Sequence, residues 1–176
     1  MSDPIRVLFV CTANICRSAY AQVRGESLMA GRPTIQLASA GTWGFDASPI
    51  DPPMGLQATA RGADPSGFRS RRLTRAMIAE ADVILTATSE HRVFILEDHP
   101  GALRKTFTLG QFAESIADAD VHLHGTEVIA AARTNRVPPR PSTDIVDPHR
   151  RGNEAAARCA RQIDDLLMTV LPRLAG

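Results

Sequence analysis

A loop near the start of the chain combines a thiol with a guanidinium: residues 10–18 read Val-Cys-Thr-Ala-Asn-Ile-Cys-Arg-Ser. A cysteine becomes a strong nucleophile where a helix N-terminus and a cation favour its thiolate. Arg17 supplies the cation, and its planar guanidinium can bind two oxygens of a phosphate at once. Ser18 can donate a hydrogen bond to the sulfur and make it a better leaving group. The pattern predicts covalent catalysis on a tetrahedral oxyanion, with Cys11 as nucleophile and Arg17 as phosphate clamp.

The segments on either side of this loop must position it. Residues 5–10 have the apolar, β-branched composition of a buried strand, and helical spacing follows over residues 18–29. Ligands of open α/β sheets bind beyond the carboxyl ends of strands, where loop N–H groups and a helix N-terminus together attract an anion. We therefore expect phosphate to be bound by the residues of the loop, namely Thr12, Ala13, Asn14, Ile15, Cys16 and Ser18.

Strand and helix patterns alternate along the rest of the chain. Further strands are predicted at residues 35–38, 82–87 and 105–109, and helices at 56–61, 74–80, 90–97, 110–117, 125–135 and 153–174. Residues 41–56 are rich in Gly, Pro and Asp and are predicted to form a long loop. This alternation predicts a three-layer α/β/α fold around a central, mostly parallel, four-stranded sheet, in one domain spanning residues 1–176.

Composition excludes several classes of function. The formal net charge is +1 and 22% of the residues are charged, so the overall field does not favour nucleic acid or an anionic membrane. The first ten residues do not resemble a signal peptide, and no stretch is apolar enough to span a bilayer, which predicts a cytoplasmic location. The cysteines are three, an odd number, and Cys11 and Cys16 lie five positions apart in one loop-like stretch, which is not the pattern of a disulfide framework in a secreted domain.

The loop resembles that of the low-molecular-weight protein tyrosine phosphatase family, which shares its fold with some arsenate reductases. The family pattern is Cys, a short run containing Asn, and then Cys-Arg-Ser. Three further segments resemble the family in the same order along the chain. They are residues 39–42 after the second strand, the basic residues 69–74, and residues 144–148, which resemble the loop that holds the general acid.

The resemblance implies a protein tyrosine phosphatase that uses neither metal nor cofactor. Cys11 would attack phosphorus to form a cysteinyl-phosphate, while Arg17 and the loop amides would stabilise the equatorial oxygens. Asp147 would protonate the leaving oxygen and then activate water. Asp144 lacks a following Pro and resembles a loop anchor. The implied partners are a tyrosine-phosphorylated protein and phosphate or another tetrahedral oxyanion, and we expect a monomer.

Some positions depart from the family pattern. Ala13 replaces a Gly, which would cost about 1 kcal/mol if that residue needs positive φ. Phe68 replaces a His that helps to hold the loop Asn. Trp43 and Phe45 lie where the family lines its substrate slot, and Trp43 is predicted to contact substrate, with core packing as an equal alternative. His149 stands where eukaryotic members have a tyrosine.

Two other functions remain open. An arsenate reductase would bind arsenate in the same socket, but the only cysteine outside the loop, Cys159, lies far from where relatives place resolving cysteines. A non-catalytic phosphate-binding module is the second alternative, favoured by the replacements at Ala13 and Phe68. In relatives an apolar residue at the position of Ile15 accompanies phosphotyrosine, and Thr accompanies phosphoarginine.

Other candidate groups have weaker support. Cys16 could form a protective disulfide with Cys11 under oxidation, with packing in the core as the alternative. His122 and His124 have metal-binding spacing, but without an evident third ligand we expect a solvated pair.

Overall fold

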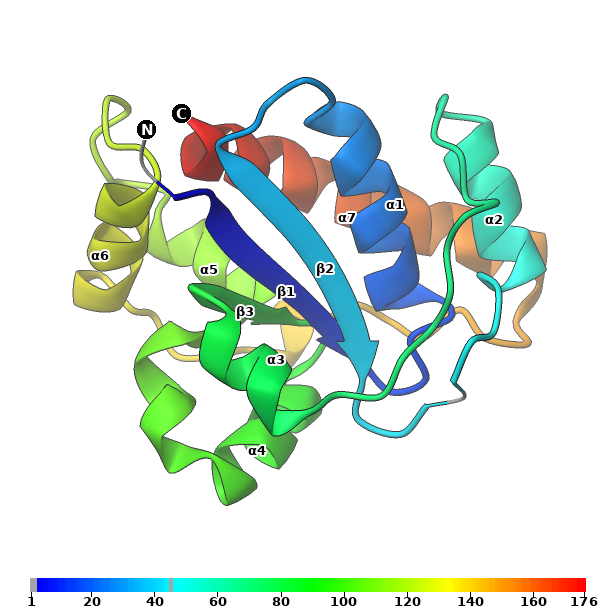
Figure 1. Ribbon diagram of the computed structural model, residues 1–176, viewed down its shortest axis with the longest axis horizontal. Coiled ribbons are helices and arrows are strands. Elements are labelled where there is room, and N and C mark those ends of the chain that lie inside the picture. Colours follow the sequence, from blue (N-terminus) through cyan, green and yellow to red (C-terminus); the bar gives the residue numbers. More distant parts are fainter. Residues whose placement is uncertain (1–2, 45) are drawn as a thin grey trace.

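The computed structural model describes residues 3–44 and 46–176 (Figure 1). At its centre is a sheet of four parallel strands in the order β2-β1-β3-β4. The strands are β1 (Ile5–Cys11), β2 (Ile35–Gly41), β3 (Val83–Thr86) and β4 (Thr106–Thr108). The predicted α/β class and the four-stranded sheet are confirmed.

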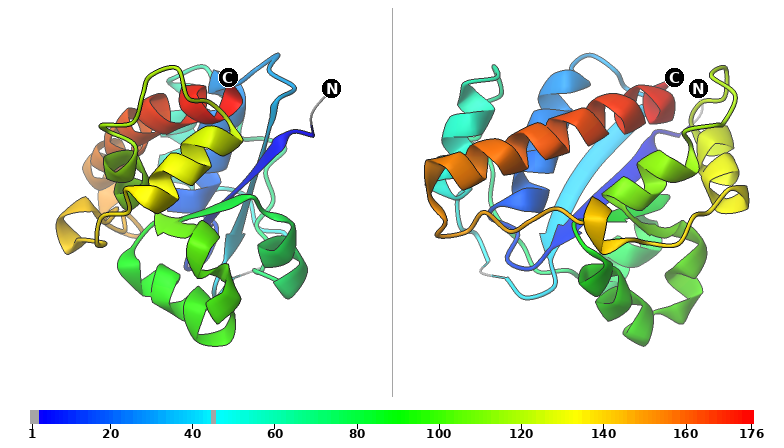
Figure 2. Two further views of the ribbon diagram at one scale, coloured as in Figure 1. Left: turned by 90° about the vertical axis from the view of Figure 1, so that its left-hand side faces the viewer. Right: turned by 180° about the vertical axis from the view of Figure 1, so that it is seen from behind.

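Both faces of the sheet are covered by helices, which is the usual arrangement for parallel strands. On β1, Val7 and Phe9 point to one face and Leu8 and Val10 to the other, and all four side chains are buried. The face of Val7 packs against α1, α5, α6 and α7, and the face of Leu8 packs against α3 and α4 (Figure 2). These helices are α1 (Arg17–Leu28), α3 (Arg75–Glu80), α4 (Ser89–Asp98), α5 (Leu109–Ser115), α6 (Thr126–Thr134) and α7 (Gly152–Ala175).

The C-terminal helix α7 lies across the same face as α1 (Figure 2). Its buried residues recur at helical spacing and include Ile163, Leu167, Val170 and Leu174. Each buried aliphatic side chain of this size contributes roughly 1.5–3 kcal/mol, so this face provides much of the core. Cys159 belongs to the same buried face, and burial raises the pKa of its thiol to about 12.

The prediction for residues 41–56 was wrong at one end. The loop after β2 ends at Asp51, and helix α2 (Pro52–Thr59) begins where the two prolines had indicated continued loop. Proline is tolerated in the first helical turn because its missing N–H would have no partner there. Two short 3₁₀ helices complete the described elements. The first, η1 (Pro100–Lys105), precedes β4, and the second, η2 (Pro141–Thr143), follows an irregular stretch over residues 136–140.

The topology places one crevice at the carboxyl end of the sheet. From β1 the chain crosses through α1 to β2, whereas from β3 it crosses through α4 to β4 on the opposite side. The loops that follow β1 and β3 therefore separate at this point, where open α/β sheets bind their ligands. None of the helices in the described ranges is long and apolar enough to cross a membrane.

Candidate active site

The loop between β1 and α1 is held from outside through its carbonyl groups. Four of these carbonyls accept hydrogen bonds of 2.8–2.9 Å from backbone N–H groups of neighbouring segments: Val10 from Ala87, Cys11 from Thr42, Thr12 from Trp43 and Ile15 from Asp51. In a trans peptide the C=O and the following N–H point in opposite directions. The N–H groups that follow these carbonyls are therefore directed away from the neighbouring segments, as an oxyanion socket requires.

Asn14 fixes the shape of the loop from within. Its φ is 55°, in the left-handed region that asparagine tolerates better than most residues. Its side-chain N–H₂ donates to Ser18 Oγ and Ser39 Oγ, both at 2.8 Å, and its Oδ1 accepts from the backbone N–H of Arg71 at 3.0 Å. The side chain is completely buried. A single asparagine thus joins the loop to α1, to β2 and to the basic segment.

Both doubts about this loop are removed by the same geometry. Among the non-glycine residues that the structure describes, positive φ occurs at Asn14, Ala47 and Arg150, so Ala13 carries no such strain. Phe68 is buried, and the amide of Asn14 has its partners without it. Neither replacement therefore favours a loop that has lost its function.

The sulfur of Cys11 lies at the start of α1. It is 3.0 Å from Ser18 Oγ, and both side chains are buried. Because α1 begins at Arg17, the first-turn N–H groups have no partner within the helix, and they place a partial positive charge at this end. Cys11 and Arg17 line a cavity of about 140 Å³ together with other loop residues and with Asp147 and His149.

The guanidinium of Arg17 closes the loop. Its side chain is buried, Nη1 donates to the carbonyl of Ile145 at 3.0 Å, and Nη2 lies 3.2 Å from Asp147 Oδ2. Its Nε is buried with no hydrogen-bond partner among the described residues. A buried donor without a partner is costly. An oxyanion in the cavity would satisfy it, so the donor set fits phosphate.

The two aspartates of the predicted acid loop have different surroundings. Asp144 Oδ1 accepts from the N–H and the hydroxyl of Ser89 at 3.0 and 3.1 Å, which anchors the loop to α4 as expected. Ile145, next in the chain, is buried and donates its N–H to Ala87. The carboxyl of Asp147 is 48% exposed and lines the cavity. Of the two, only Asp147 lines the cavity over Cys11.

His91 belongs to the site but was not predicted from the sequence. Its Nε2 is 2.8 Å from Thr12 Oγ1, and its Nδ1 is 2.8 Å from Thr88 Oγ1. Burial, reinforced by the cation of Arg17, lowers the pKa of His91 to about 4, so the ring is neutral at pH 7. It connects the loop after β3 to the phosphate loop. The sequence feature that could have indicated this role is the position of His91 shortly after β3, since β3 pairs with β1 in the sheet.

Trp43 lies outside the cavity over Cys11. Its side chain is 67% exposed, and its ring meets the edge of Phe94 of α4 at a centroid distance of 6.4 Å. It lines a neighbouring cavity with Thr74 and His99, whereas the cavity over Cys11 is lined without it. The structure does not bring Trp43 to the nucleophile. Phe45, the other aromatic candidate, lies outside the described residues.

The remaining cysteine and histidine candidates differ in their burial. All three cysteines are free. Burial, with Asp51 and Asp147 nearby, raises the pKa of the Cys16 thiol well above its usual range. His122 and His124 are exposed, and in the described part of the chain they are not grouped with a third metal-binding side chain.

Known proteins are similar in sequence to a large part of this chain, including the loop that contains Cys11 and Arg17. The model of a family described as low molecular weight phosphotyrosine protein phosphatase matches residues 6–125. A protein-arginine-phosphatase of Geobacillus stearothermophilus is 35% identical over 118 residues, which are 67% of this chain and 77% of the relative. The low molecular weight protein-tyrosine-phosphatase Etp of Escherichia coli K12 is 36% identical over 109 residues, 61% of this chain and 71% of the relative.

A solved structure extends the likeness to nearly the whole chain. The YwlE arginine phosphatase from G. stearothermophilus superposes with a TM-score of 0.76 at 27% identity, covering 97% of this chain and 93% of its own. The family match includes Cys11 and Arg17 but ends before Asp147. The role of Asp147 therefore depends on the geometry of the cavity.

Proposed function

The chain belongs to the low molecular weight phosphotyrosine protein phosphatase family, and on this premise we propose that it hydrolyses phosphotyrosine-type aryl phosphate monoesters through a cysteinyl-phosphate on Cys11. Like its family, it is a cysteine-dependent phosphatase that acts on phosphorylated proteins. The assignment of catalytic roles to individual residues rests on one observation. The sulfur of Cys11, the guanidinium of Arg17 and the carboxyl of Asp147 line the same small cavity at the start of α1.

In the first step the sulfur of Cys11 attacks phosphorus, an S–P bond forms, and the bond from phosphorus to the aryl oxygen breaks. The phosphoryl oxygens are bound by Arg17 and by the loop N–H groups, which offset the charge that develops on them. An entering phosphate competes with Asp147 for the guanidinium, 3.2 Å away. The released carboxyl group, in its protonated form, delivers its proton to the leaving oxygen.

In the second step water hydrolyses the cysteinyl-phosphate. Asp147, now a carboxylate, takes a proton from the water as it attacks phosphorus, and the S–P bond breaks. The hydroxyl of Ser18, 3.0 Å from the sulfur, donates a hydrogen bond to the departing thiolate. Inorganic phosphate leaves and the free enzyme is restored. The positive charge for both steps comes from Arg17 and the loop amides, so a metal ion is not required.

Phosphoarginine is the second candidate substrate, because the relative that is 35% identical is a protein-arginine-phosphatase. The cavity wall favours an aryl ester. Ile15 offers an apolar surface with no hydroxyl for a guanidinium, and the imidazole of His149 stands opposite the loop. A phenyl ring can pack against both groups. Comparing turnover of a phosphotyrosine peptide with that of the matching phosphoarginine peptide separates the two substrates.

The test of the mechanism uses aryl phosphates of graded leaving-group basicity, in the presence of a chelator. Cys11→Ser is expected to abolish turnover while still binding phosphate. Asp147→Ala should lower kcat by on the order of 10²–10⁴-fold with phenyl phosphate, and much less with 4-nitrophenyl phosphate, whose leaving group needs little protonation. Asp165→Ala, on the exposed side of α7, is the matched control and should be neutral. An equal loss with every leaving group would remove Asp147 from the role of acid.

The same variants address the two other functions. An arsenate reductase would reduce arsenate in the presence of a small thiol faster than it hydrolyses aryl phosphates. A binding module would bind phosphate with no turnover in the unaltered protein. Either result contradicts the proposal.

A further inference from the structure

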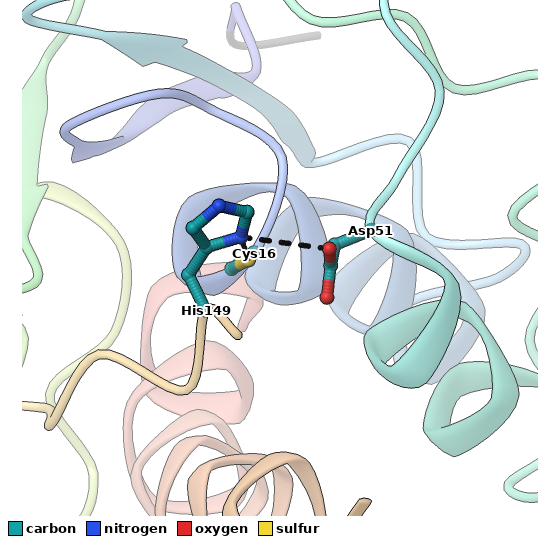
Figure 3. A group of neighbouring side chains, drawn as sticks. All are labelled: Cys16, Asp51 and His149. Atoms are coloured by element: carbon teal, nitrogen blue, oxygen red, sulfur yellow. Dashed lines mark hydrogen bonds and ion pairs between the residues drawn. The ribbon is translucent and has the colours of Figure 1, made fainter. Parts of the chain in front are cut away.

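Three side chains that take no part in the chemical steps converge at the edge of the cavity (Figure 3). Cys16 is the last residue before α1, Asp51 the last before α2, and His149 follows Asp147 by two residues in the acid loop. His149 Nδ1 lies 3.9 Å from Cys16 Sγ and 3.6 Å from Asp51 Oδ1, and all three ligand atoms lie within 4.8 Å of one another. In the described part of the chain this is the only such group.

These distances are close to those that a tetrahedral zinc ion imposes on its ligands. Zn–S bonds of about 2.3 Å and Zn–N or Zn–O bonds of about 2.0 Å place S and N about 3.5 Å apart and N and O about 3.3 Å apart. The two separations from His149 Nδ1 exceed these values by a few tenths of an ångström, and Cys16 Sγ and the Asp51 carboxylate oxygen lie within 4.8 Å of each other. His149 is in a turn and its side chain is 41% exposed, so a small movement of this residue can close the difference.

The chemistry of the three ligands also favours zinc over lighter ions. A thiolate, an imidazole and a carboxylate together match a borderline-soft divalent ion, whereas Mg²⁺ and Ca²⁺ select oxygen ligands. One thiolate and one carboxylate balance the two charges of the ion. A Cys-His-Asp catalytic triad is a poor alternative, because both partners face the same nitrogen of the ring, whereas a triad uses the two nitrogens separately (Figure 3).

We propose that Cys16, Asp51 and His149 form a zinc site that joins the phosphate loop to the acid loop, and that zinc bound there inhibits the enzyme. Binding replaces the proton of the Cys16 thiol by a Zn–S bond and releases that proton to solvent. The other two bonds form to His149 Nδ1 and Asp51 Oδ1, and water completes the tetrahedron.

Inhibition follows from the position of the site and rests on the proposed function. Cys16 and His149 both line the catalytic cavity, so an ion between them narrows its entrance. The N–H of His149 also donates to Asp147 Oδ1 at 3.2 Å. Fixing His149 therefore restrains the carboxyl group that has to leave Arg17 and follow the leaving oxygen.

Binding is tested without turnover by using Co²⁺ as a spectroscopic probe. The protein carries Cys11→Ser, so that Cys16 is the only thiol left in the cavity. One equivalent of Co²⁺ should give a thiolate-to-cobalt charge-transfer band and the intense visible bands of tetrahedral cobalt, and Zn²⁺ should abolish both. Adding Cys16→Ser should remove the charge-transfer band, and adding His149→Gln should weaken Co²⁺ binding at least tenfold. Adding His122→Gln, at an exposed histidine far from the site, should change nothing.

Absence of the charge-transfer band from the Cys11→Ser protein, or its persistence after Cys16→Ser is added, would overturn the site. Circular dichroism checks that the Cys16→Ser protein is folded, and His149→Gln, at a more exposed residue, tests the site independently of that buried thiol.

Inhibition is measured separately, on protein with Cys11 intact. The Zn²⁺ concentration for half-inhibition of aryl phosphate turnover should rise at least tenfold in His149→Gln and stay unchanged in His122→Gln. Equal inhibition of the His149→Gln and unaltered enzymes would show that zinc acts elsewhere, for example on Cys11. If the protein bound Co²⁺ as described but lacked turnover, the proposed function would fail and the metal site would stand.

Discussion

Asn14 is expected to be the residue on which the shape of the phosphate loop depends most. Its side chain makes three buried hydrogen bonds, to Ser18, Ser39 and Arg71, and each is worth about 1 kcal/mol net. Asn14→Gly retains the freedom to adopt a φ of 55° and loses these bonds, so it should lower the free energy of unfolding by about 3 kcal/mol. Asn14→Ala also incurs a left-handed penalty of roughly 1 kcal/mol more.

Urea unfolding followed by circular dichroism measures both losses, with unchanged m-values as the sign that only stability has changed. A loss of about 4 kcal/mol leaves a domain of ordinary stability folded but loosens the loop, so kcat should fall in both variants. Asn153→Ala, at an exposed asparagine in the first turn of α7, is the control and should stay within about 0.5 kcal/mol. The reasoning is refuted if Asn14→Gly costs less than about 1 kcal/mol, or if Asn14→Ala is as stable as Asn14→Gly.

Two further predictions concern contacts to the same loop. A Cβ at Gly41 would lie 2.5 Å from the carbonyl oxygen of Thr12, so Gly41→Ala must displace the loop and should lower kcat by on the order of 10²-fold, as assayed with 4-nitrophenyl phosphate; near-normal activity would contradict the close approach. The pKa of His91 is about 4 in the native protein, below its usual 6.5, so the unfolded state takes up a proton first as the pH falls. Stability should be fully present above pH 6.5 and decrease by up to about 3 kcal/mol on acidification to pH 4. That part of the pH dependence should disappear in His91→Gln, measured by urea unfolding at several pH values; identical slopes for the two proteins would show that His91 is not kept neutral.

The features that the sequence predicted correctly are local. The strand Ile5–Cys11, the loop and helix α1 follow one another directly, and each is specified by its own residues. The helix predicted over residues 153–174 is likewise present, as α7. The start of α2 was missed because Pro52 and Pro53 were taken as a continuation of the loop, although the first turn of a helix accommodates proline.

Features that depend on long-range packing could not be predicted. His91 meets Thr12 across 79 positions of sequence, which requires knowing that β1 and β3 are neighbours. Trp43 contacts the ring of Phe94 in α4, far along the chain, and composition does not specify such a contact. The loop does contain a residue with positive φ, as the concern about Ala13 assumed, but that residue is Asn14.

The central claim, that Cys11 carries the phosphoryl group, is tested most directly by trapping the intermediate. The Asp147→Ala enzyme is mixed with 4-nitrophenyl phosphate, stopped with denaturant during turnover and digested for mass spectrometry. Because this substrate leaves without much help from an acid while hydrolysis of the intermediate still needs a base, the phosphorylated protein should accumulate. We predict one phosphoryl group on the peptide that contains Cys11, and none when Cys11→Ser is added. Phosphate on another residue, or turnover with no phosphorylated cysteine at any time, would contradict the account.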